Sequence, residues 1–399
     1  MRARSILGMG LLWAVALVGF QLLVSARYAP ERPDLALEWT RYETGPHSHD
    51  EQPYLLEPFM RQFVAWDSEF YLSIALHGYD DPAVRSVEVG GRRVSLNYAF
   101  FPLYPAVVRV LSRPLGGVMG RVAAATLVGV LVSVLGAIAA ALSLFFLVRV
   151  DGSESRAFKT VFFFLVFPTS FFLAQVYTEG LFTGLAFGSM ALSRHRKVGW
   201  AAFLAVLATW TRPVGVCLVL PIGWACWEEW RERRRDGVAL AGSHFALAPV
   251  AAFLVWRFTP LGRNFGDVEH EFFGRGVLQL RQSAATWWHV VGLVGGGRPE
   301  TRVYYGMELA ATLAALFACL ATLRRMPGPS LFGLAALLLA LTSGVAQGLV
   351  RFVLVVPSLF VVLGGIGERS PVLDRAWTVA SVLLLGMLAS LFTFDLWVA

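Results

Sequence analysis

The stretch VAAATLVGVLVSVLGAIAAALSLFFLV, residues 122–148, contains no charged side chain. About 20 consecutive apolar residues are enough for a helix to cross a bilayer core, where backbone polar groups must be satisfied within the segment. This run therefore predicts a membrane-spanning helix. The run ILGMGLLWAVALVGFQLLV at residues 6–24 has the same character. A cleaved signal peptide is the alternative there, but the run exceeds the usual signal core of about 7 to 15 residues, which favours a first spanning helix.

The composition extends this interpretation to the whole chain. Of the 399 residues, 56% are hydrophobic and 15% are charged, whereas about a quarter are charged in soluble domains. The net charge of +7 comes almost entirely from arginine. Because the apolar runs interrupt the basic residues, we expect contacts with lipid headgroups and no nucleic-acid partner. Cys217, Cys226 and Cys319 lie in apolar runs without metal-ligand spacing and are expected to be buried as small apolar side chains.

Short basic loops predict the orientation of the spans, because such loops stay on the cytoplasmic side. The start MRAR places the N-terminus in the cytoplasm and residues 26–96 outside, as a large first extracytoplasmic loop. Further basic loops then fall on the cytoplasmic side at 149–159, 194–197, 231–237, 324–328 and 367–375. This pattern predicts an all-α polytopic membrane protein in one domain over 1–399. It would have about eleven spans, an external C-terminus and a second extracytoplasmic loop at 259–302.

The remaining apolar runs predict helices, some of them paired. One pair occupies 160–193 with an external turn at 175–180, and another lies at 199–211 and 213–229. Single helices are expected near 240–258, 303–323, 331–345, 349–366 and 377–397. Two prolines and a flanking arginine in 98–112 favour an interfacial or re-entrant helix over a full span.

The first extracytoplasmic loop holds the most unusual polar residues. Apolar side chains recur there at spacings of three or four, at Leu55, Phe59, Phe63, Trp66, Phe70 and Ile74. This spacing predicts one helix lying in the headgroup plane, which Gly78 would end. Asp67 would then sit at the membrane surface, where a partly desolvated carboxylate can act as a general base. The alternative is a solvated loop with ordinary surface acids.

Several motifs together resemble one family. WDSEFYLSIALHGY (66–79), followed by NYAFFPLYP (97–105), resembles the signature of the PIG-V family, which are membrane mannosyltransferases of the GT-C fold. Three later blocks agree in order: FPTSFFLAQVYTEGLF (167–182), TWTRPVG (209–215) and GLVRFVLVVPSLF (348–360). The resemblance covers nearly the whole chain, and each block carries residues expected on the external side.

The resemblance implies a mechanism. The donor would be a polyprenyl-phosphate sugar, most simply mannose, and the reaction would invert the anomeric centre on the extracytoplasmic face. Asp67 would take the proton from the acceptor hydroxyl. Arg212 and Arg351 would bind the donor phosphate, because a desolvated arginine offers bidentate contacts to phosphate. The alternative for each is an arginine that merely reaches the membrane surface.

Other polar side chains in these motifs are candidates for binding the sugar or the acceptor. They are Glu69, His77, Asn97, Tyr98, Tyr104, Tyr177 and Glu179. Glu179 could instead hold Arg212, and His77 could simply cap a helix. Residues 262–276 match no motif and are interpreted as a cover over the site or an acceptor contact. We predict no obligatory cofactor and leave metal dependence open; Tyr79–Asp81 could bind a divalent cation, with a solvated turn as the alternative.

The chain would therefore be an integral membrane glycosyltransferase acting on a glycolipid or cell-envelope acceptor. The near absence of lysine indicates a bacterial chain, and hence the plasma membrane. A transporter or lipid flippase is the alternative, as is a catalytically inactive relative. Transporters place ionisable residues at mid-membrane in paired repeats, whereas here the polar groups gather in one external loop and at helix ends. The sequence also contains no glycine-rich phosphate loop, which argues against a nucleotide-sugar donor.

Overall fold

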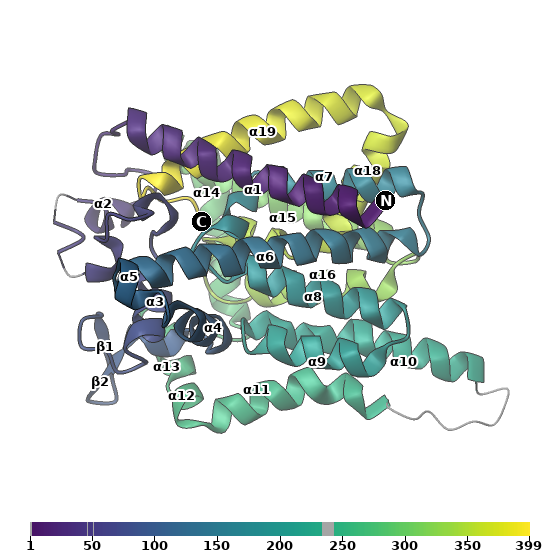
Figure 1. Ribbon diagram of the computed structural model, residues 1–399, viewed down its shortest axis with the longest axis horizontal. Helices are drawn as coiled ribbons and strands as arrows, with labels where there is room; N and C mark the ends of the chain where they lie inside the picture. The colour runs from purple at the N-terminus through teal and green to yellow at the C-terminus, as the bar shows by residue number, and fades with distance from the viewer. Residues whose placement is uncertain (1, 46, 51, 234–242) are drawn as a thin grey trace.

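The computed structural model describes residues 2–45, 47–50, 52–233 and 243–399, and it is mostly helical (Figure 1). Within these ranges, four helices are long and apolar enough to cross a membrane. They are α1 (Arg2–Arg27), α6 (Arg121–Arg149), α15 (Pro299–Thr322) and α19 (Pro371–Thr393). A fifth would be formed by Ser243–Phe258 with Pro260–Glu271, which meet at 88°. The chain is therefore an integral membrane protein, while the count of about eleven spans stays a prediction.

The predicted helix pairs are present, although their members are short. α7 (Glu154–Leu165) and α8 (Glu179–Arg194) form one pair around the single turn η4 (Ser170–Ala174). α9 (Val198–Thr209) and α10 (Val219–Arg233) form the other around η5 (Pro213–Leu218). α16 (Pro327–Leu341) corresponds to the helix predicted near 331–345. The basic loop predicted at 231–237 lies largely outside the described residues, as do the first residues of the helix predicted at 240–258, of which α11 (Ala248–Phe258) is described.

The predicted helix at 349–366 is wrong, because it is two helices. The first helix, α17 (Leu349–Val353), ends at Val353. The second helix, α18 (Pro357–Arg369), begins at Pro357. Proline has no backbone N–H and clashes with the preceding turn, so it begins a helix more readily than it continues one. The break leaves α17 as a short separate helix, and this helix carries Arg351.

Helices α6 and α8 pack with their backbones in close contact. A Cβ atom at Gly180 would lie 2.1 Å from the carbonyl oxygen of Ser133, and one at Gly136 would lie 2.4 Å from the backbone of Gly180. Small residues at such a crossing allow two helices in a membrane to approach closely. This contact sets the position of the first turn of α8, which begins at Glu179.

The first-loop elements gather at one end of the bundle, and the N-terminus of α1 lies at the other (Figure 1). These elements are α2 (Thr40–Glu43), η1 (Pro53–Leu55), η2 (Arg61–Phe63), α3 (Ser68–Leu76), β1 (Ser86–Val89) and β2 (Arg92–Ser95). The segment after the loop adds η3 (Leu96–Ala99), α4 (Leu103–Ser112) and α5 (Gly116–Met119), of which η3 and α4 pack against α3. α4 confirms a short helix within 98–112. The two strands pair antiparallel through a turn at Gly90 and Gly91, both of which have positive φ. The prediction of an all-α fold is therefore wrong for this hairpin.

The single long helix predicted across the first loop is also wrong. Only α3 is regular there, because Met60 and Trp66 adopt left-handed backbone angles of φ 58° and 50° and turn the chain before it. Pro58 further disfavours a continuous helix. Most of the apolar residues at helical spacing are instead buried by separate short segments, while Phe59 is exposed. The end was predicted correctly, since α3 stops just before Gly78, which has φ 98°.

The second predicted loop is largely helical, although the sequence analysis assigned no helix to it. It contains α12 (Pro260–Arg263), α13 (Phe265–Glu271) and α14 (Leu280–Gly296). Thr259 caps α12, because its hydroxyl accepts a hydrogen bond from the Gly262 N–H at 3.3 Å. α13 packs against β1 and η3, so this segment comes close to the end of the bundle that carries Asp67 (Figure 1).

Candidate active site

The backbone at Asp67 is fixed by a tyrosine from another part of the chain. Tyr177 is buried, and its hydroxyl donates to the Ala65 carbonyl oxygen at 3.0 Å and accepts from the Asp67 N–H at 3.2 Å. Trp66, between them, holds its left-handed conformation. Asp67 itself precedes α3 and its carboxylate caps no helical N–H. The carboxylate is therefore free to face side chains and the cavity.

Asp67 belongs to a chain of ion pairs that joins four of the sequence motifs. Its Oδ2 atom lies 3.0 Å from Nη1 of Arg351, and the Arg351 Nε atom lies 2.9 Å from Oε1 of Glu179. The same Glu179 oxygen accepts a hydrogen bond from Arg212. Glu179 is fully buried and both arginines are 11% exposed, whereas Asp67 is 24% exposed. Two carboxylates and two guanidinium groups balance in charge, as a buried cluster requires.

A buried acid that the motifs did not indicate holds Arg351 in place. Glu308 on α15 accepts backbone hydrogen bonds from Gly348 and Val350, each at 2.8 Å. These bonds fix the first turn of α17, because its leading N–H groups have no partner within the helix. The Arg351 guanidinium also lies over the Tyr177 ring, 4.8 Å from its centroid. The available signal was an acid inside an apolar run, which is by default a functional candidate.

A cavity of about 390 Å³ opens beside Asp67 and Arg351. One wall is formed by three tryptophans, Trp39, Trp66 and Trp397, which meet edge to face with ring centroids 4.7 to 5.9 Å apart. The cavity size is within the range of small-molecule sites, about 300 to 1,000 Å³. Aromatic faces beside a carboxylate suit a sugar ring, which presents apolar C–H faces and polar hydroxyl edges.

The unmatched segment 262–276 lies over this cavity. Glu269, Phe272, Phe273 and Arg275 all line it. Among the described residues, the Arg275 side chain has no hydrogen bond or ion pair, whereas the nearby Arg85 is paired with Glu43 at 3.0 Å. Arg275 is thus a cation at the cavity with no carboxylate at ion-pair distance in the described residues, although its charge acts on Glu269 in the same cavity. Sequence reasoning missed it, because no motif contains it.

Several predicted site residues lie away from the cavity and maintain the loop around α3. Asn97 is buried, and its side chain donates to the Ser73 hydroxyl at 2.8 Å and to the Gly78 carbonyl at 3.2 Å. The remaining contacts are Tyr98 with Asp80 at 2.8 Å, His77 with Tyr54 at 2.6 Å, and Tyr104 with the Gly129 carbonyl at 3.0 Å. These partners give the four side chains a structural role at this end of the bundle.

Glu69 is also absent from the cavity wall. It is 1% exposed, and its Oε1 atom has no hydrogen-bond partner among the described residues. Burial raises the pKa of Glu69 to about 7, against the lowering effect of Arg85. Glu69 therefore holds a proton at a pH where an exposed glutamate is ionised.

The predicted cation ligands of Tyr79–Asp81 are engaged elsewhere. Asp81 accepts hydrogen bonds from Tyr54 and from Ser73, the latter at 2.8 Å. Across the described parts of the chain, no group of three or more His, Cys, Asp or Glu side chains is placed to hold a metal ion. The three cysteines are buried and unpaired, as predicted.

Comparisons with known proteins agree with the motifs. The profile of the family Mannosyltransferase (PIG-V) matches residues 15–228. GPI alpha-1,6-mannosyltransferase 2 of Cricetulus griseus is 33% identical over 171 residues, which cover 41% of this chain and 32% of that protein. The human protein of the same name is 29% identical over 169 residues, which cover 41% of this chain and again 32% of that protein. The matches thus span about a third of these relatives' length.

A solved structure shows the same fold. ArnT from Cupriavidus metallidurans, bound to undecaprenyl phosphate, superposes with a TM-score of 0.50 at 16% identity, over 96% of this chain and 76% of that chain. This likeness identifies the GT-C fold. Because the family profile covers more than half of the sequence, the chain belongs to the PIG-V mannosyltransferase family.

Proposed function

We propose that this protein is an inverting glycosyltransferase that transfers mannose from a polyprenyl-phosphate-mannose donor to a hydroxyl of a glycolipid or cell-envelope acceptor. The observation that carries the proposal is the Asp67 carboxylate at the cavity, which pairs with Arg351 while Tyr177 fixes the Asp67 backbone. Only its Oδ2 atom is paired with Arg351, and the other oxygen has no hydrogen bond among the described residues. That oxygen is available to an acceptor hydroxyl.

In the proposed reaction, Asp67 takes the proton of the acceptor hydroxyl while the acceptor oxygen bonds to the anomeric carbon. The bond from that carbon to the donor phosphate oxygen breaks, and the lipid phosphate leaves with the electron pair. Attack from the face opposite the leaving group inverts the anomeric centre. The tryptophan wall would hold the sugar ring.

Cations at the cavity would stabilise the leaving phosphate. Arg351 and Arg275 both line it, so we propose them as the phosphate contacts. Arg212 does not line the cavity and contacts Glu179 instead. Its proposed role is therefore to hold Glu179, which in turn orients Arg351.

We further propose that the cavity faces the extracytoplasmic side of the plasma membrane, with the N-terminus in the cytoplasm and residues 1–399 as one membrane domain. The N-terminus and the first-loop elements lie at opposite ends of the bundle (Figure 1), which supports this orientation. About eleven spans would be reached if the shorter apolar helices also cross, as broken or tilted segments.

The test is transfer of radiolabelled mannose from polyprenyl-phosphate-mannose to a lipid extract by the purified protein. Asp67→Asn should lower the rate by about 10² to 10⁴, the usual contribution of a general base. Asp80→Asn is the matched control, because Asp80 is an exposed acid in the same loop. Equal transfer by wild type and Asp67→Asn would overturn the assignment. Movement of the lipid across the bilayer without transfer would favour a flippase.

A further inference from the structure

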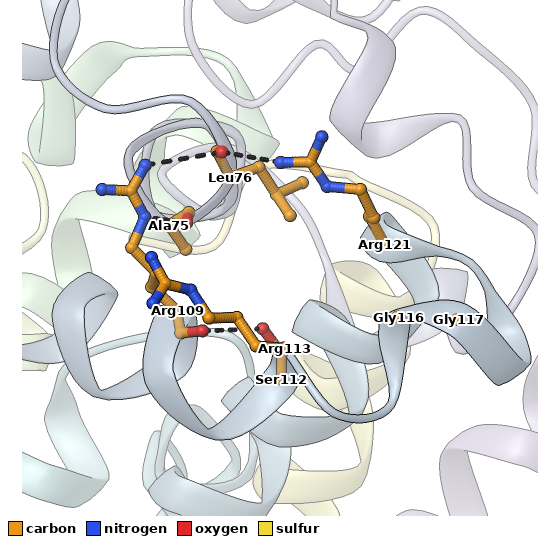
Figure 2. Close-up of a pocket in the computed structure, with 8 residues that line it drawn as sticks. All are labelled: Ala75, Leu76, Arg109, Ser112, Arg113, Gly116, Gly117 and Arg121. Carbon is orange, nitrogen blue, oxygen red and sulfur yellow. Dashed lines mark hydrogen bonds between the residues drawn. The ribbon is translucent and has the colours of Figure 1, made fainter.

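A second cavity, of about 440 Å³, lies at the C-terminal end of α3, and it is lined by three arginines (Figure 2). Arg109 comes from α4, Arg113 directly follows α4, and Arg121 begins the span α6. No carboxylate lines this cavity, and none of the three arginines forms an ion pair within the described residues. Three cations share one small opening, an arrangement that repels itself unless an anion binds there.

Two of the arginines have a structural role that accounts for only part of their bonding capacity. Arg109 donates from Nε to the Ala75 carbonyl at 2.8 Å, and Arg121 donates from Nη2 to the Leu76 carbonyl at 2.9 Å. Figure 2 shows both guanidinium groups reaching the Leu76 oxygen. They cap the last turn of α3, where carbonyl groups lack helical partners. Within the described ranges, Nη1 of Arg109 and both Nε and Nη1 of Arg121 donate to no other group.

Arg113 has no such structural role. It is exposed, and its side chain has no hydrogen bond or ion pair with any described residue. Helix capping therefore explains Arg109 and Arg121 but not the third guanidinium. Together the free donors of the three arginines form a fork suited to a phosphate group.

The surroundings of the cavity identify which kind of phosphate compound fits. Val110 and Leu111 follow Arg109 in α4, Val118 lies in α5, and these three side chains are 62%, 52% and 88% exposed. Arg121 is also the first residue of a 29-residue apolar span. The cavity thus lies where a spanning helix begins, on short helices that also expose apolar side chains, as expected for the headgroup level of a bilayer.

We propose that this cavity binds the phosphate of an anionic membrane phospholipid, with the acyl chains along Val110, Leu111 and Val118. The site is distinct from the Asp67 cavity, because it lies at the other end of α3, whose nine residues span about 14 Å. The bound phosphate joins the two arginines that cap α3. It therefore braces the helix that positions Asp67, and the proposal does not depend on the reaction assigned to Asp67.

The test uses the purified full-length protein in neutral detergent micelles, with Tm and co-purifying lipid as readouts. Phosphatidylglycerol added to the micelles should raise Tm, whereas phosphatidylcholine or inorganic phosphate should not. Arg113→Gln should weaken the apparent affinity for phosphatidylglycerol about tenfold, the loss expected for one charged phosphate contact. Arg92→Gln is the matched control, because Arg92 is an exposed arginine at the same end of the bundle and does not line the cavity.

Arg113 makes no contact that folding requires, so Arg113→Gln should match wild-type Tm without lipid. Asp67→Asn should keep full lipid binding, which separates this site from the catalytic one. Equal shifts with phosphatidylcholine, equal shifts with inorganic phosphate, or unchanged affinity in Arg113→Gln would each overturn the proposal.

Discussion

Arg351 lies between two carboxylates, and its shape matters as much as its charge. It reaches Asp67 through Nη1 and Glu179 through Nε, so one planar group spans both acids. A lysine ammonium is a compact point charge and cannot reproduce this fork. The residue thus couples the proposed base to the buried end of α8.

We expect Arg351→Lys to lower kcat/KM for mannose transfer by at least roughly tenfold while expression and Tm change little. Arg351→Ala should be worse in both activity and Tm, because removing one partner of a buried ion pair costs about 3 to 5 kcal/mol. Steady-state kinetics with varied donor measure the effect, and Arg92→Lys is the control. A fully active Arg351→Lys enzyme would show that the fork is not required.

Glu69 predicts a dependence of stability on pH. Because burial raises its folded pKa to about 7 from 4.5, the folded protein binds the Glu69 proton more tightly than the unfolded chain does. The contribution of Glu69 to the free energy of unfolding is fully present below pH 4.5 and declines as the pH rises towards 7. Glu69→Gln should remove this decline and raise Tm at pH 8. Melting curves from pH 4.5 to 8 measure it, with the exposed Glu88→Gln as control; a Glu69→Gln protein that loses stability at pH 8 would contradict it.

At the scale of elements, the contact between α6 and α8 determines where Glu179 lies. The backbones touch at Gly136 and Gly180, and the Ser133 hydroxyl donates to the Tyr177 carbonyl at 2.8 Å just before α8. Glu179, which holds Arg351, and Tyr177, which holds the Asp67 backbone, are therefore both fixed by this one helix contact. A substitution that pushes these two helices apart should therefore displace the candidate site even though no polar residue is changed.

We expect Gly180→Ala to destabilise the protein by about 1 to 3 kcal/mol and to reduce transfer, because the added Cβ would lie 2.1 Å from the Ser133 carbonyl oxygen. Gly199→Ala is the matched control, since a Cβ at Gly199 in α9 meets nothing within 4 Å. Tm and transfer are measured for both variants. If both behave like wild type, the close helix contact does not control the site.

At the scale of the whole molecule, the two ends of the bundle should face different compartments. Arg92 lies in the hairpin at the Asp67 end, and Arg196 lies between α8 and α9 at the end where α1 starts. In intact cells, a membrane-impermeant thiol reagent should label Arg92→Cys and spare Arg196→Cys until the cells are opened. The native cysteines are buried, so background labelling should be low. The reverse pattern would invert the proposed topology.

The sequence by itself determined the membrane class, the approximate positions of most helices, the end of α3 at Gly78 and the family. These are properties of contiguous residues: hydropathy, turn-forming glycine and local motifs. The helical spacing of apolar residues at 53–79 led to a wrong prediction of one long helix, because this stretch consists of several short segments. The turns at Met60 and Trp66 that separate them cannot be predicted from the spacing of apolar residues.

Only the tertiary structure decided which polar residues meet. It brought Arg351 to Asp67, 284 positions apart, and added Glu308, Arg275 and the tryptophan wall to the candidate site. It also left Asn97, Tyr98 and His77 with structural partners away from the cavity. The physical reason is that ion pairs between helices depend on how closely and at what depth the helices pack, and local sequence patterns do not encode that.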